Sequence, residues 1–234
     1  MPAPTQDVVS VAHLIGRLGC YPTMTFPACG GRTPDVGLLW RYLAEPAEFF
    51  GLQLPTPEQL CQAIGTPAGR LTAITVTLIE DARLLVAAGD AGFDAEPVRL
   101  AELGGACDDT VVAPERWVAM AARTVSLAGT DQQRRVLTEK GYVDRIAGGA
   151  ALLGALVLDT ATGLVAVEPA APAAPIVAAL AACGASTGLP LGTATDGALR
   201  AWWISSQFVI HPVAQLGTQM LTADLTCPPF LEQM

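Results

Sequence analysis

The chain has 234 residues, of which 51% are hydrophobic, 15% charged and 6% aromatic, and its formal net charge at pH 7 is −9. A charged fraction so far below the usual value of about 25% excludes a disordered polypeptide, and the length suffices for a large hydrophobic core. The acidic balance argues against a nucleic-acid partner, because phosphate binding draws on a clustered basic surface.

Other counts narrow the class of protein further. The most apolar stretch, Ala147 to Leu158, is too short for a membrane-spanning helix, which needs about 20 residues. Asp7 and the lack of a basic flank argue against a secretory signal. The six cysteines form no CxxC pair, and there are only two histidines. We therefore expect a cytoplasmic protein with no membrane partner and no metal site.

The first half of the sequence predicts a helix followed by a β-hairpin. Pro34 to Phe50 has apolar residues at helical spacing, and Pro46 is expected to bend or divide that helix. Leu71 to Ile79 alternates, with Ala73, Thr75 and Thr77 on the side opposite its larger apolar residues. A turn at Glu80-Asp81 then leads into a second strand, Arg83 to Ala88.

The second half begins near Pro114. Thr130 to Gln133 is a capping box that starts a helix, and this helix ends with Lys140 before Gly141. The elements expected after it are a strand at Leu152 to Leu158, a strand at Leu164 to Val167, a helix at Pro175 to Cys183, and strands at Trp202 to Ile204 and Val213 to Leu216. The mixture predicts an α+β fold with two lobes, residues 1–113 and 114–234.

Several segments resemble the class IV aminotransferase family, which includes branched-chain and D-amino-acid aminotransferases and aminodeoxychorismate lyase. The similar segments are GCYPTMTFPACGGRTPDVGLLWRYLAEPAEFFGLQLP, the hairpin from Gly69-Arg70 to Asp81, ARTVSLAGTDQQRRVLTEKGYVD, and WWISSQFVIHPVAQLG. The resemblance implies a homodimer of two-lobed subunits, each with a pocket between its lobes. In this family the pocket holds pyridoxal phosphate on a lysine.

This sequence departs from the family pattern at the residues that would hold the cofactor. The family's lysine falls at Arg123 or Thr124, neither of which can form an aldimine. Lys140, the only lysine, follows about sixteen residues later, and Leu38 or Leu39 replaces a basic residue of the family. The segment after Glu168 is too short for the family's hairpin and phosphate loop, which shortens the second lobe. We therefore expect no cofactor.

The resemblance also implies which residues line the pocket. The expected catalytic residues are Tyr21, Arg123, Glu168 and His211, and the expected substrate-binding residues are Thr23, Arg32, Thr124, Ser126, Ser205, Ser206 and Gln207. Ser205 and Ser206 resemble what is left of a phosphate cradle, but no GxSxG motif supports a nucleophilic serine.

For each expected catalytic residue a structural role is the alternative. Arg123 is either an anion clamp or the partner of Asp131 or Glu115 in a salt bridge. His211 is either a general acid–base or a hydrogen-bonded structural residue, expected in the final loop. Glu168 is a base if it is buried and an exposed strand end if it is not. Tyr21 and Thr23 either point into the pocket or pack in a core or a dimer interface.

Three functions follow from this sequence. We expect first a cofactor-independent biosynthetic enzyme that performs cyclase, lyase or isomerase chemistry on a small carboxylated or polyketide-like metabolite, in bacterial secondary metabolism. The second is a non-catalytic protein that binds a metabolite or a protein partner. The third is a pyridoxal phosphate enzyme that uses Lys140.

Overall fold

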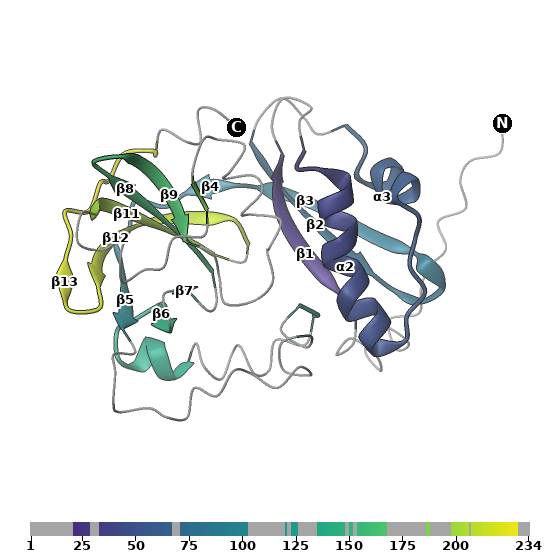
Figure 1. Cartoon of the computed structure of the whole chain (residues 1–234), viewed down its shortest axis with the longest axis horizontal. Helices are drawn as coiled ribbons and strands as arrows, with labels where there is room; N and C mark the ends of the chain where they lie inside the picture. Colours follow the sequence, from purple (N-terminus) through teal and green to yellow (C-terminus); the bar gives the residue numbers. More distant parts are fainter. Residues whose placement is uncertain are drawn as a thin grey trace.

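The computed structural model describes residues 21–28, 33–66, 71–102, 120, 123–125, 135–147, 150–151, 154–167, 186–187, 198–205 and 207–228. They form a small sheet covered by two helices and a larger sheet, which lie side by side in Figure 1. The mixed α and β architecture in two lobes agrees with the fold class predicted from the sequence.

The small sheet has the strand order β1-β2-β3 and is antiparallel throughout. Its strands are β1 (Thr23–Ala28), β2 (Thr72–Leu78) and β3 (Leu84–Asp90). The short 3-10 turn η2 (Glu80–Ala82) joins β2 to β3, which confirms the predicted hairpin. The helices α2 (Val36–Phe50) and α3 (Pro57–Ile64) pack on one face of this sheet through Leu39, Leu43 and Leu60.

Both helices are capped by side chains or glycine at their ends. The Asp35 carboxylate accepts a hydrogen bond from the backbone N–H of Leu38 at 2.9 Å, and Gly51 ends α2 at a φ of 70°. Thr56 and Gln59 form a capping box at the start of α3. Pro46, expected to bend or divide α2, does not divide it, because the helix continues on both sides of the proline.

Among the described residues, ten strands form the larger sheet, in the order β10-β9-β8-β11-β12-β5-β6-β7, with β4 and β13 also paired to β12. They are β4 (Gly92–Phe93), β5 (Val98–Glu102), β6 (Asp144–Ala147), β7 (Ala150–Ala151), β8 (Ala155–Thr160), β9 (Gly163–Val167), β10 (Ser186–Thr187), β11 (Ala198–Ile204), β12 (Val209–Leu216) and β13 (Gln219–Met220). Residues 92–102, assigned by the sequence to the first lobe, thus belong to this sheet.

The two faces of the larger sheet carry separate core clusters. Trp203 packs on one face with Leu156, Leu158 and Val213. Trp202 packs on the other face, in a cluster that includes Phe208 and also Ala73 of β2. Adjacent strand residues point to opposite faces, so the face that carries Trp202 is the one in contact with the small sheet.

The helix before Gly141 forms, and the other helices of the described chain are short. Residues 135–139 are helical, and Gly141 follows at a φ of 78°, as predicted for that helix end. The capping box at Thr130 and the helix at Pro175 to Cys183 lie outside the described residues. None of the helices in the described part of the chain has the length and apolar character needed to cross a membrane.

Candidate functional site

Four threonines lie together on one face of the small sheet. Thr23 pairs with Thr77 and Thr25 with Thr75 across β1 and β2. Their hydroxyl oxygens are 3.0 Å and 2.9 Å apart, respectively, and Thr23 Oγ1 also donates to the carbonyl of Val76 at 3.3 Å. We call these four residues the threonine face. All four are half-buried, in contrast to the buried apolar residues that alternate with them.

The threonine face is turned toward the larger sheet. Ala73 shares it with Thr75 and Thr77, because residues two apart on a strand point the same way. Ala73 is 7% exposed and packs in the cluster of Trp202. The helices cover the opposite face, and in Figure 1 β1 lies between α2 and the larger sheet. The half-buried threonines therefore lie on the same face as the buried Ala73, which packs against the larger sheet.

Residues 123–125 run antiparallel beside the start of β1. Pro22 and Thr124 form a β-bridge, the N–H of Thr23 donates to the carbonyl of Arg123 at 2.8 Å, and the N–H of Val125 donates to the carbonyl of Tyr21 at 3.0 Å. Four expected site residues, Tyr21, Thr23, Arg123 and Thr124, are thus neighbours. Tyr21 and Thr124 are fully buried.

The Arg123 side chain packs against α2. Its Nη1 lies 2.5 Å from Oε2 of Glu45, its Nη2 donates to the backbone carbonyl of Tyr42, and its guanidinium carbon lies 4.1 Å from the centre of the Tyr42 ring. The ion-pair partner is therefore Glu45, whereas Asp131 and Glu115, the partners expected from the sequence, lie outside the described residues. The guanidinium belongs to the side of the small sheet opposite the threonine face.

This packing also changes the acidity of Tyr42. Burial of the phenol raises its pKa above the ordinary value of 10.0, while the charge of Arg123 and a hydrogen bond from it act in the opposite direction. The larger effect is burial, so Tyr42 keeps its proton under ordinary conditions.

Ser205 organises the turn between β11 and β12. Its Oγ accepts hydrogen bonds from the N–H groups of Gln207, at 3.3 Å, and Val209, at 3.0 Å. Phe208 has a positive φ of 60° and is 1% exposed, so its ring anchors the turn in the cluster of Trp202. Ser205 and Gln207 therefore lie at the end of the sheet that contacts the small lobe, with the Ser205 hydroxyl engaged in holding the turn.

His211 was expected in a loop, and that expectation is wrong, because His211 lies within β12. It pairs with Trp203 on β11, and their rings are 5.7 Å apart. His211 therefore shares the face of Trp203, away from the contact with the small sheet. Its Nδ1 is buried without a hydrogen-bond partner among the described residues and lies 3.8 Å from Oδ2 of Asp94.

Trp203 connects His211 to a buried carboxylate. The indole Nε1 donates to Oδ2 of Asp144 at 2.8 Å, and Asp144 is 0% exposed. Oδ1 of Asp144 accepts from the N–H of Arg145 at 2.7 Å. Neither Asp144 nor Asp94 was singled out in the sequence for this role, since nothing in their spacing indicates contact with a tryptophan or a histidine far along the chain.

The expected site is therefore only partly assembled by the described residues. The structure brings Tyr21, Thr23, Arg123 and Thr124 together, and places His211 on the far face of the larger sheet. Four expected site residues lie outside the described part of the chain: Arg32, Ser126, Glu168 and Ser206. Sequence reasoning missed Thr25, although the alternation of threonine in TMTF and TAITVT could have indicated paired hydroxyl rows.

Comparison with solved structures identifies the fold. A hypothetical aminotransferase from Mycobacterium tuberculosis in its PLP-bound form has 18% identity and a TM-score of 0.61, over 99% of this chain and 93% of that one. A fold IV-transaminase, CpuTA1, from Curtobacterium pusillum has 18% identity and a TM-score of 0.56, over 91% and 84%. A branched-chain aminotransferase from Thermoproteus uzoniensis has 16% identity and a TM-score of 0.57, over 97% and 87%. No family model and no curated protein sequence matches the chain.

These neighbours correct the expectation that no cofactor is involved. One of them holds PLP, so the solved structures of this fold point to PLP rather than to no cofactor. The described residues nevertheless do not fit a lysine-linked cofactor at residues 123–125. The Arg123 guanidinium is taken up by Tyr42 and Glu45, and Lys140 is exposed beyond the end of the helix at residues 135–139. The chain thus has the fold of the class IV aminotransferases.

Proposed function

We propose that this protein binds a small hydroxylated metabolite on the threonine face, at the junction between its two sheets. The supporting observation is the set of four half-buried hydroxyls on the side of the small sheet that faces Trp202. Binding sites combine mostly apolar walls with a few placed polar groups, and the apolar cluster that includes Ala73 and Trp202 supplies such a wall beside the threonines.

The hydrogen bonds within the face favour a particular ligand chemistry. Because Thr23 donates to the carbonyl of Val76, Thr77 is the donor in the Thr23–Thr77 pair. In the Thr25–Thr75 pair one hydroxyl donates, and the hydrogen of the other has no further acceptor among the described residues. The face therefore offers one donor and several acceptor lone pairs. A hydroxyl group both donates and accepts and fits this pattern better than a carboxylate, which only accepts.

The test is to remove one pair of hydroxyls without changing shape. In Thr25→Val/Thr75→Val both partners of a hydrogen bond become apolar, so no unpaired polar group is left and the sheet keeps its packing. Small molecules from a cell extract that stay bound to the protein are identified by mass spectrometry of the native complex. We expect a hydroxylated compound on the wild type, and a loss of binding of about tenfold, or 1.4 kcal/mol, in the double variant.

Two controls sharpen this test. Thr25→Ser/Thr75→Ser keeps the hydroxyls and should retain binding. Thr162→Val removes a hydroxyl that, among the described residues, bonds within its own turn, and it should leave binding unchanged. Equal binding by the valine and serine variants would show that the ligand lies elsewhere.

A second candidate is acid–base chemistry on a different metabolite, bound at the face of the larger sheet that carries His211. It is favoured by Nδ1 of His211, which is buried, has no hydrogen-bond partner among the described residues and lies 3.8 Å from Oδ2 of Asp94. In deuterium oxide, the wild type should exchange a carbon-bound hydrogen of the metabolite faster than His211→Gln. Equal exchange rates would exclude His211 from the chemistry. The homodimer, the cytoplasmic location and the role in secondary metabolism remain predictions, and the mass in solution tests the first.

A further inference from the structure

The ion pair between Arg123 and Glu45 is unequal in its exposure. The Arg123 side chain is 3% exposed, whereas that of Glu45 is 47% exposed. A buried cation is therefore neutralised by a carboxylate that reaches in from the surface of α2. The Nε of Arg123 is buried and has no hydrogen-bond partner in the part of the chain that the structure describes. The guanidinium thus has binding capacity that the observed contacts do not use.

The rest of the Arg123 side chain is anchored independently of Glu45. Pro46 has no N–H, so the carbonyl of Tyr42, four residues earlier, loses its usual helical donor. Nη2 of Arg123 donates to this carbonyl, and the guanidinium stacks on the Tyr42 ring. Removal of the Glu45 carboxylate would therefore leave the arginine in place, with Nη1 open toward the surface.

We propose that Arg123 is the binding site for the carboxylate of a small ligand, which enters by displacing Glu45. One carboxylate replaces another on the same guanidinium, so the charge-assisted hydrogen bond is conserved in the exchange. The displaced Glu45 regains side-chain freedom, and exposed Arg41, one helical turn earlier, can pair with it at the i, i+4 spacing. Glu45 then acts as an internal competitor that sets the affinity of the site.

This site is independent of the threonine face, because α2 covers the opposite side of the small sheet. The ligand chemistry differs as well, since the threonine face favours hydroxyl groups and Arg123 favours an oxyanion. Either proposal can therefore fail without the other.

The experiment is an acetate titration of the whole chain, followed by NMR of the arginine Nε–Hε signals at constant ionic strength with chloride as the reference anion. Arg123→Lys identifies the Arg123 signal by its absence. In Glu45→Gln the internal competitor is lost, so the Arg123 signal should shift at acetate concentrations at least tenfold lower than in the wild type. Glu48→Gln removes the same charge one turn from the site and should titrate like the wild type.

A second measurement covers the case in which Glu45→Gln is poorly folded. Acetate should raise the urea midpoint of Glu45→Ala more than that of Glu45→Ala/Arg123→Met, because only the first retains the guanidinium. An Arg123 signal that acetate leaves unchanged in Glu45→Gln would overturn the proposal. So would equal acetate effects on the two alanine-based variants.

Discussion

Arg123 donates a hydrogen bond through Nη2 to the backbone carbonyl of Tyr42. This carbonyl would accept from residue 46 in an ordinary α-helix, but residue 46 is proline. A side chain from residues 123–125 thus replaces a missing main-chain donor in α2. The contact explains how the helix continues past Pro46, and it ties the segment beside β1 to the helix that covers the sheet.

The first prediction concerns this replacement. Arg123→Met should lower the free energy of unfolding by about 2 kcal/mol, because the Tyr42 carbonyl loses its donor. In a Pro46→Ala background residue 46 regains its N–H. Arg123→Met should therefore lower the free energy of unfolding by about 1 kcal/mol less than it does in the wild type. Urea unfolding of the four proteins in a double-mutant cycle measures the difference. Additive effects would show that Arg123 does not compensate for the proline.

The fold was more predictable than the site, for a physical reason. The apolar periodicity of Pro34 to Phe50 and the alternation of Leu71 to Ile79 are local properties, and both elements form where expected. The partners of Arg123 depend on how α2 packs against residues 123–125, which are distant in the sequence. The same holds for His211, where the pairing of β11 with β12 decides which face the ring occupies.

The second prediction concerns the close approach of Gly154 to β11. A Cβ at position 154 would lie 2.3 Å from the carbonyl oxygen of Ile204 and 2.6 Å from Nε1 of Trp203. Because backbone has to move, Gly154→Ala should lower the free energy of unfolding by about 2 to 3 kcal/mol.

Gly89→Ala is the matched control for this substitution, because a Cβ there meets nothing within 4 Å. Its unfolding free energy should change by about 0.5 kcal/mol or less. Chemical unfolding monitored by tryptophan fluorescence compares the two variants, and equal stability would contradict the tight contact at Gly154.

The third prediction concerns the buried pair of Asp144 and Trp203. Asp144→Ala leaves the buried indole N–H of Trp203 without its acceptor. The free energy of unfolding should therefore fall by about 2 kcal/mol or more. Asp144→Asn keeps an acceptor oxygen at the same place and should cost less. In a Trp203→Phe background the donor is absent, so Asp144→Ala should be milder by about 1 kcal/mol. Equal costs in both backgrounds would show that Asp144 acts through its other contacts.

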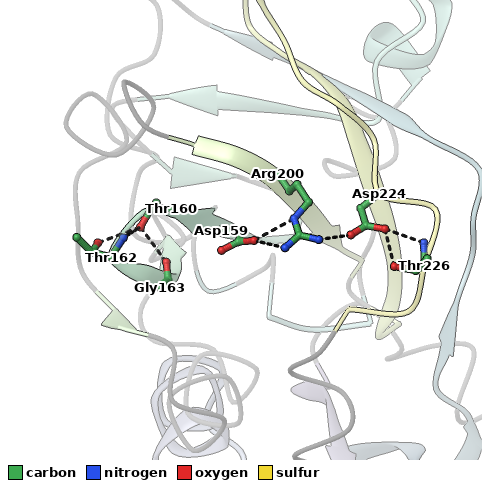
Figure 2. Close-up of polar contacts among 7 residues, drawn as sticks. All are labelled: Asp159, Thr160, Thr162, Gly163, Arg200, Asp224 and Thr226. Atoms are coloured by element: carbon green, nitrogen blue, oxygen red, sulfur yellow. Dashed lines mark hydrogen bonds and ion pairs between the residues drawn. The ribbon is translucent and has the colours of Figure 1, made fainter.

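The fourth prediction uses the polar chain in Figure 2, in which Arg200 joins Asp159 to Asp224 and Thr226 bonds to Asp224. Hydrogen bonds from the Thr226 hydroxyl and, secondly, its N–H lower the pKa of the Asp224 carboxyl below its ordinary value of 3.8, with a smaller effect of Arg200. A lowered pKa in the folded state means that the folded protein binds the proton less readily than the unfolded chain. The ionised Asp224 carboxylate therefore adds to the free energy of unfolding in full above pH 3.8. This contribution is lost as the pH falls through the lower pKa of the folded state.

Thr226→Ala removes the hydroxyl donor but keeps the backbone N–H, so part of the pKa shift should disappear. The wild type should be more stable than Thr226→Ala at pH 7, and the difference should narrow as the pH falls below 3.8. Thr162→Ala serves as the control, because within the described part of the chain its hydroxyl contacts Thr160 rather than a carboxylate, so its effect should not depend on pH. Urea unfolding at pH 7, 4 and 2.5 measures all three proteins. A difference between the wild type and Thr226→Ala that stays constant with pH would show that the Thr226 hydroxyl does not act on the ionised form of Asp224.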